Sequence, residues 1–119
     1  MADSAKIEEI LRDIESLEGV NEAILVSRSG MYIAGKLPSE VHAETYASMF
    51  AVLLGAADTA TAELREQLSS VVVNLENSKV VVIADGPKAL FVLRVSREVR
   101  VSRLKDSLIA YSDRLQEYL

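Results

Sequence analysis

Cysteine is absent from this chain, and histidine occurs once, as His42. The absence of cysteine excludes disulfide bonds and metal sites built from thiolates. Nucleophilic and acid–base catalysis usually require histidine, cysteine or a desolvated pair of carboxylates. A lone histidine in the first turns of a predicted helix is most often a surface residue. The sequence therefore predicts no catalytic residue and a protein that is not an enzyme.

Motifs for metals, phosphates and nucleotides are missing as well. The acidic residues Asp58, Glu63 and Glu66 have neither histidine nor cysteine beside them and lack the spacing of a calcium loop, so we interpret them as a solvated face. Residues 102–105 fit a Ser-x-x-Lys pattern without its companion motifs. The glycines form neither a phosphate loop nor a dinucleotide fingerprint. We therefore expect no metal and no cofactor.

Long hydrophobic runs are also lacking. The longest one, Tyr46 to Ala57, is shorter than the ~20 residues that a helix needs to cross a bilayer, which predicts no membrane span. The N-terminus does not resemble the basic and apolar start of a signal peptide. The chain has 119 residues and no break in composition. We therefore predict a single domain over residues 1–119 and a cytoplasmic location.

Positive charge is in short supply, because the chain carries a net charge of −5 and has a pI of about 4.9. Nucleic acid is an unsuitable partner for such a chain, since phosphate contacts require a basic face. One basic run begins at the end of the last predicted strand and comprises Arg94, Arg97, Arg100, Arg103 and Lys105. Of these, Arg97, Arg100 and Arg103 are candidates for contact with an acidic partner or a phosphate. The alternative interpretation is a solvated strand end and helix face.

What the sequence does contain is a clear apolar periodicity. Apolar residues at three- and four-residue spacing predict an amphipathic first helix, with Asp3 or Ser4 as its cap. Residues 18–35 then predict a β-hairpin with a short turn. Gly19 suits the left-handed position that follows a helix. The first third of the chain is therefore expected to form a helix followed by two antiparallel strands.

A second helix is predicted from Ser39, as its cap, to about Glu66, which corresponds to roughly 40 Å at 1.5 Å per residue. It is apolar nearly all round, and small residues recur along it at four-residue spacing, namely Ala43, Ala47, Ala51 and Gly55. Such a helix is normally buried on two sides. We expect the sheet on one side and a second copy of the chain on the other. The alternative is a helix buried within its own domain.

β-branched residues at a period of two predict three further strands, at residues 70–75, 79–84 and 89–95. Asn77 stands where the first connecting turn is expected to need a positive φ, and residues 85–88 are a second breaker cluster, so both connections are predicted to be hairpins. An amphipathic helix from Val101 closes the chain. The order α-β-β-α-β-β-β-α predicts an α+β fold, in which a five-stranded antiparallel sheet packs with helices.

Several of these features belong together. They are the Glu18-Gly19-Val20 step, the hairpin at residues 23–30, the Ala-rich long helix, the Val-rich strands and the closing helix. In this order they resemble the Roadblock/LC7 family, which includes dynein light chains of that name and prokaryotic MglB-type regulators of Ras-like GTPases. The resemblance covers essentially the whole chain and implies a roadblock/profilin-like sandwich.

The resemblance implies a homodimer in which the long helices pack side by side and the third strands pair edge to edge into one continuous sheet. At or near the helix pair it places Ala47, Ala51, Leu54 and Gly55. On the paired strand it places Val71, Val72, Val73 and Asn74. Such pairing would also cover a Val-rich sheet edge that is otherwise prone to aggregation.

The resemblance also implies a function. Members of the family bind small Ras-like GTPases and alter their nucleotide cycle, so we expect a non-enzymatic homodimeric adaptor of that kind. The alternative is a scaffold subunit, similar to a dynein light chain, without effect on GTP turnover. An arginine finger from Arg97 or Arg100 is a further hypothesis. A small-ligand sensor of the PAS or profilin kind is disfavoured, because a filled Val, Leu and Phe core leaves no pocket.

Overall fold

The computed structural model describes residues 3–119, and its helices and strands follow one another in the predicted order. Their bounds are α1 (Ser4–Glu15), β1 (Val20–Ser27), β2 (Tyr32–Gly35), α2 (Ala43–Ala62), β3 (Val71–Asn74), β4 (Lys79–Asp85), β5 (Ala89–Val95) and α3 (Val101–Gln116). Every strand pair is antiparallel. The predicted α+β fold with a five-stranded antiparallel sheet is therefore confirmed.

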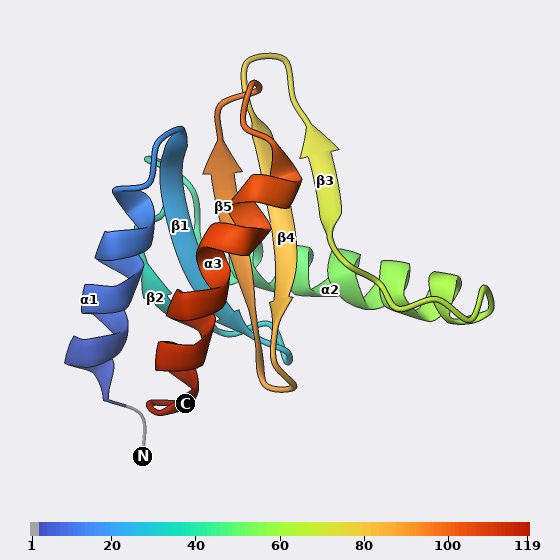
Figure 1. Ribbon diagram of the computed structural model, residues 1–119, viewed down its shortest axis with the longest axis horizontal. Coiled ribbons are helices and arrows are strands. Elements are labelled where there is room, and N and C mark those ends of the chain that lie inside the picture. Colours follow the sequence, from blue (N-terminus) through green and yellow to red (C-terminus); the bar gives the residue numbers. More distant parts are fainter. Residues whose placement is uncertain (1–2) are drawn as a thin grey trace.

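The strands lie in the order β2-β1-β5-β4-β3 (Figure 1). β5 is the central strand and pairs along its whole length with β1 on one side and with β4 on the other. β2 and β3 are consequently the two edges of the sheet. The strand that the sequence analysis assigns to a subunit contact, β3, is thus one of these edges.

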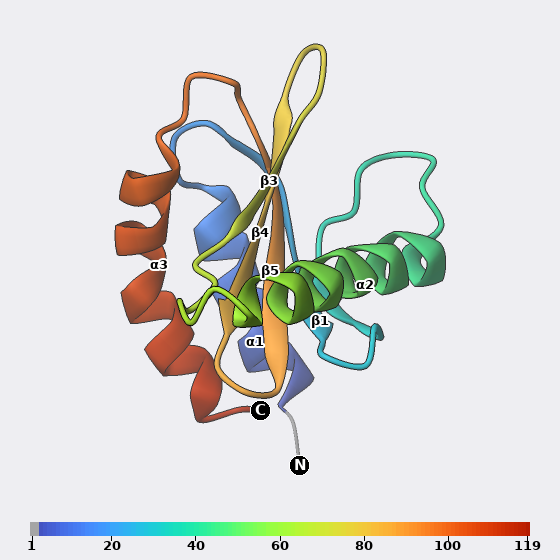
Figure 2. The ribbon, with the colours of Figure 1, turned by 90° about the vertical axis from the view of Figure 1, so that its right-hand side faces the viewer.

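One face of the sheet is covered by α1 and α3, which pack against each other (Figure 2). Because successive strand residues point to opposite faces, every second residue of β1 and β5 contributes to this layer, among them Leu25, Phe91 and Leu93. Asp3 caps α1, as predicted, because its Oδ1 accepts a hydrogen bond from the N–H of Lys6 at 3.2 Å. This layer is the larger part of the core.

Gly19, which follows α1 in the chain, contacts the loop before α3. Its φ of +84° is left-handed, as predicted, and a side chain at this position would collide with Val99. Its carbonyl oxygen accepts a hydrogen bond from the N–H of Ser96 at 2.8 Å. An ion pair between Asp13 and Arg114, at 3.6 Å, connects α1 to α3 further along. The two helices are therefore held to each other as well as to the sheet.

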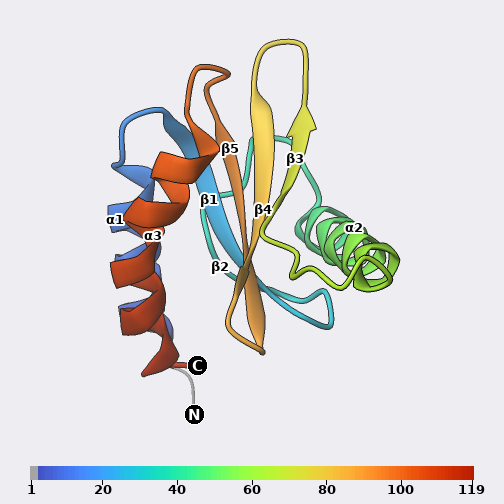
Figure 3. The ribbon, with the colours of Figure 1, turned by 45° about the vertical axis from the view of Figure 1, so that its right-hand side comes forward.

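The opposite face carries α2 alone (Figure 3). This helix buries only Ala47 and Leu54, while Tyr46, Phe50 and Ala51 are half-buried against the same face of the sheet. In Figure 1 the last turns of α2 run past β3 and extend beyond the sheet. Within residues 3–119, no helix is long and apolar enough to span a membrane.

The predicted start of α2 is wrong. The helix begins at Ala43 rather than at Ser39, and the preceding residue, His42, makes no side-chain cap hydrogen bond. Glu40 adopts a φ of +67°, a left-handed conformation that a right-handed helix cannot contain. The pattern Pro38-Ser39-Glu40 therefore forms part of the loop instead of the first helical turn.

The predicted end of α2 and the conformation of one turn are also wrong. The helix ends at Ala62 rather than near Glu66, and Arg65 adopts a φ of +58° just beyond it. Asn77 does not adopt the positive φ expected in the β3–β4 hairpin, because Glu40 and Arg65 are the non-glycine residues with positive φ among residues 3–119. The hairpin itself is confirmed, since β3 and β4 pair directly.

Candidate partner-binding surfaces

The outer face of α2, which points away from the sheet, is apolar and exposed. Met49 is 56% exposed and Val52 is 61% exposed. No charged residue occurs between Thr45 and Ala57. Gly55 faces open space, since an added Cβ would have no heavy atom within 4 Å. An exposed apolar helix face of this kind is typical of a contact with another molecule or chain.

The structure separates the helix residues that the sequence analysis assigns to a subunit contact. Ala47 and Leu54 have 0% and 2% exposure and pack on the protein's own sheet. Ala51 is half-buried beside them, and Gly55 is exposed. Of this set, Gly55 is therefore the most accessible to a second chain, whereas Ala47 and Leu54 pack the helix against the sheet.

Met49 and Val52 are not among the predicted site residues. A helix that is apolar nearly all round does not indicate which of its faces meets the sheet, so the contact residues predicted on it are those that the family resemblance implies. A signal was nevertheless present in another form. The uncharged segment also contains these larger apolar side chains three residues apart, and three-residue spacing places them on one face.

The β3 edge lies beside α2 and is open. The N–H of Leu75 donates to the carbonyl of Ser78 in the turn before β4 at 2.9 Å. Because backbone groups alternate along an antiparallel ladder, Val72 and Asn74 direct their N–H and C=O groups away from β4. No side chain within residues 3–119 bonds to these outward groups. The side chains of Val71 and Val73 pack toward α2, whereas that of Val72 is 38% exposed on the other face.

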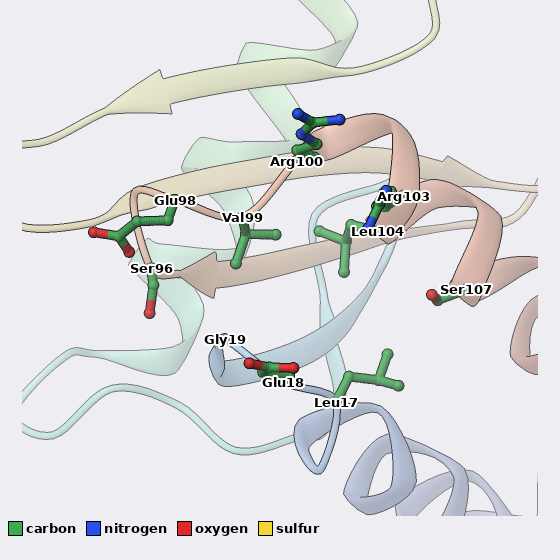
Figure 4. Close-up of a pocket in the computed structure, with 10 residues that line it drawn as sticks. All are labelled: Leu17, Glu18, Gly19, Ser96, Glu98, Val99, Arg100, Arg103, Leu104 and Ser107. Carbon is green, nitrogen blue, oxygen red and sulfur yellow. The ribbon is translucent and has the colours of Figure 1, made fainter.

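The three candidate arginines do not form one cluster. Arg97 donates through Nη1 to the carbonyl of Glu76 in the β3–β4 loop at 3.0 Å. Arg100 and Arg103 instead line a depression of about 780 Å³ between the end of α1 and the start of α3 (Figure 4). The same depression is lined by the apolar side chains of Leu17, Val99 and Leu104 and by the carboxylates of Glu18 and Glu98.

The fourth arginine of the basic run, Arg94, belongs to a different environment. Its Nε and Nη2 donate to the two carboxylate oxygens of Glu22 at 2.5 and 2.7 Å, across the β1–β5 pair. These hydrogen bonds raise the pKa of Arg94 above its ordinary value. The bidentate pair satisfies the buried Glu22 carboxylate on the α2 side of the sheet. Arg94 is therefore part of the fold rather than of a free basic surface.

A buried carboxylate fastens the far end of α3. Asp85 is 1% exposed at the β4–β5 turn, and its Oδ1 accepts hydrogen bonds from the Ser112 hydroxyl and, at 3.1 Å, from Gln116 Nε2. Its Oδ2 is buried without a partner within residues 3–119. Burial raises the pKa of Asp85, against the opposing effect of its two hydrogen bonds, and nearby Asp113 raises it further. No pattern in the sequence indicates this group.

No group of three or more histidine, cysteine or acidic side chains is placed to hold a metal ion within residues 3–119. The chemistry that the surfaces offer is thus apolar contact along α2, backbone hydrogen bonding along β3 and charge pairing at Arg100 and Arg103.

The sequence model of the Roadblock/LC7 domain matches residues 6–94, which is most of the chain. The chain belongs to the Roadblock/LC7 family. A relative of this family member, an uncharacterized protein of Methanocaldococcus jannaschii, is 30% identical over 88 residues, which cover 73% of this chain and 77% of the relative. The family resemblance expected from the sequence is therefore confirmed.

Solved structures share the fold of this Roadblock/LC7 protein. The gliding protein MglB of Thermus thermophilus is 22% identical with a TM-score of 0.80, over 97% of this chain and 89% of MglB. A Roadblock/LC7 domain of Streptomyces avermitilis is 16% identical with a TM-score of 0.81, over 93% and 95% of the two chains. A profilin of Acanthamoeba castellanii is 14% identical with a TM-score of 0.65, over 94% and 98%. The roadblock/profilin-like fold is thus confirmed.

Proposed function

We propose that this Roadblock/LC7 protein is a non-enzymatic homodimeric adaptor that binds a small Ras-like GTPase and modulates its nucleotide cycle. Membership of the family supports this role, as does the likeness of the fold to MglB. The observation that carries the proposal is the combination of an uncharged, exposed α2 face with an open sheet edge beside it. The exposed side chains of Met49 and Val52 and the outward backbone groups of β3 lie outside the protein's own core.

The two surfaces fit one symmetric contact. Antiparallel pairing of two β3 strands satisfies the outward groups of Val72 and Asn74 on both copies and continues the sheet. Because α2 already extends past β3 (Figure 1), its last turns would then lie over the partner copy. The same pairing brings the two α2 helices together through Met49, Val52 and Gly55. Apolar burial would drive the contact, and strand pairing would fix its register.

The dimer is tested by two separate substitutions, each of which replaces an exposed apolar side chain with a charged one. Val52→Glu, on α2, is expected to convert a particle of two chains into a particle of one chain by light scattering at micromolar concentration. Ile109→Glu is the matched control, because Ile109 is 60% exposed on α3, on the other face of the sheet. It is expected to leave two chains. A wild-type protein with the mass of one chain would overturn the dimer.

The GTPase contact requires a separate assay. A regulator changes a nucleotide cycle only if it binds one nucleotide state of the GTPase more tightly than the other. Wild-type protein is therefore expected to bind a Ras-like GTPase from the same genome differently in its GDP state and its GTP-analogue state, and to change the rate of GTP hydrolysis. Binding without any change in hydrolysis would assign the scaffold role instead. No binding in either state would overturn the proposal.

Arg100 and Arg103 are proposed to contribute to the partner contact through charge pairing. Reversal of both charges, by Arg100→Glu and Arg103→Glu together, is expected to weaken GTPase binding and to reduce its dependence on salt. Lys6→Glu and Arg12→Glu together, at exposed positions of α1, are the control for the same change in net charge. Equal effects of the two sets would remove the arginines from the binding surface.

A further inference from the structure

The second edge of the sheet, β2, differs from β3 in its outward backbone groups. The N–H of Lys36 donates to the carbonyl of Ala23 in β1 at 3.0 Å. Alternation along the ladder therefore turns the N–H and C=O of Gly35 away from β1. The register of this pair shifts between Leu25 and Val26. Gly35 is thus the outward-facing residue on the Lys36 side of this shift, and a strand added along this part of the edge would have to bond to it.

Both outward groups of Gly35 are already occupied by side chains of the same protein. Its N–H donates to Oε1 of Glu8, which reaches over from α1, at 3.4 Å. Its carbonyl oxygen accepts a hydrogen bond from the hydroxyl of Tyr32 at 2.6 Å. Glu8 and Tyr32 are each half-buried, so both are held close to the strand. An incoming strand would have to displace a carboxylate and a phenol before it could pair here.

The backbone shape at Gly35 keeps this arrangement in place. Its φ is +109°, a value that side chains rarely tolerate, and a Cβ at this position would collide with the carbonyl of Ala23. Glycine is therefore required for β2 to lie close to β1 at this point, with its free groups turned toward Glu8 and Tyr32.

A sheet with two open edges can add copies without limit, because every added chain presents a new edge. We propose that Glu8 and Tyr32 close the β2 edge, so that the sheet of this protein can be extended by a second copy only at β3. This inference rests on the dimer of the proposed function. It explains how an assembly based on strand pairing stops at one contact per chain.

The test removes the two closing groups and measures particle mass by light scattering over a wide range of protein concentration. The double variant Glu8→Ala/Tyr32→Phe is expected to grow with concentration to particles of four chains or more. The control Glu9→Ala/Tyr111→Phe changes the same residue types, elsewhere on α1 and on α3, and is expected to match the wild type. Circular dichroism melting confirms that all variants are folded.

A third change separates this inference from the dimer proposal. Val72→Pro blocks pairing at β3 without loss of a ladder hydrogen bond, because the Val72 N–H points outward. Added to the double variant, it is expected to stop growth at two chains, joined through β2. A double variant with the wild-type mass at every concentration overturns the closed edge. If the wild-type protein has the mass of one chain and Val72→Pro does not change that mass, only the dimer proposal is overturned. In that case, growth of the double variant to two chains would still support the inference that Glu8 and Tyr32 close the β2 edge. Glu8→Gln and Tyr32→Phe singly, as milder changes, are expected to give smaller shifts in the same direction.

Discussion

The two faces of the sheet are built from the same strands but are covered very differently. On one face α1 and α3 together bury seven large side chains, namely Ile7, Ile10, Leu11, Ile14, Leu104, Leu108 and Leu115. On the other face α2, the longest helix, buries only Ala47 and Leu54 and exposes Met49 and Val52. The first face serves the stability of the single chain, and the second leaves apolar surface exposed.

The largest expected effect compares two leucines of the central strand that point to opposite faces. Leu93 faces α1 and α3, Leu90 faces α2, and both are almost completely buried. Leu93→Ala is expected to lower the free energy of unfolding by about 4 kcal/mol. Leu90→Ala is expected to cost about 2.5 kcal/mol, because a single helix can move inward and fill part of the cavity. Urea unfolding at low protein concentration measures both. Equal costs would show that α2 is as firmly fixed as the pair α1 and α3.

A smaller effect is expected from the buried carboxylate on the side of α3. Because burial raises the pKa of Asp85 above its ordinary value of 3.8, the folded state holds this proton more tightly than the unfolded state. The resulting stability is present at low pH and is lost as pH rises through the raised pKa. Asp85→Asn is expected to remove this decline and to stabilise the protein at neutral pH by about 1 kcal/mol.

The measurement is urea unfolding of the Asp85 variant and the wild type from acidic to neutral pH. Asp106→Asn, at an exposed position of α3, is the control and is expected to follow the wild type. A wild-type protein whose stability rises over the same range, by an amount that Asp85→Asn abolishes, would contradict the prediction. It would mean that the Ser112 and Gln116 hydrogen bonds outweigh burial.

The smallest expected effect concerns the outer face of α2. Val52→Ser is expected to change the free energy of unfolding of the single chain by less than about 0.5 kcal/mol, because this side chain contributes little to the core. The melting temperature of the wild type is expected to rise with protein concentration, and that of Val52→Ser to rise less, since assembly stabilises the folded state by mass action. A large loss at high dilution would place Val52 in the core and weaken the contrast between the faces.

Periodicity predicts the elements of both faces but not the orientation of α2. The run of Val80, Val81 and Val82 predicts a strand correctly, because any strand between two layers needs apolar residues at successive positions. A helix that is apolar nearly all round contains no such information about which side meets the sheet. The family resemblance places Ala47 at or near the helix pair; the structure shows it packed inward, and Val52, which is exposed, is not among the predicted residues.

Local conformation that depends on tertiary contacts could not be predicted from sequence patterns. Ser39 is followed by an acidic residue and resembles a helix cap, but Glu40 is left-handed and the helix begins only at Ala43. The spacing of Arg97, Arg100 and Arg103 predicts one basic run, whereas Arg97 is drawn to the carbonyl of Glu76 and only the other two share the depression. Contacts between distant segments decide where these side chains lie, and spacing along one segment does not encode them.

The contact between Gly19, after α1, and the loop before α3 also has a consequence for the motions of the protein. Because the chain at Gly19 fits against Val99 and bonds to Ser96, α1 cannot separate from the sheet without disturbing the approach to α3. In native-state hydrogen exchange the amides of α1 and α3 should therefore open together, as one cooperative unit of high free energy. Those of α2 should open separately and more easily, so that the helix proposed to meet a second chain would also be the one free to adjust to it.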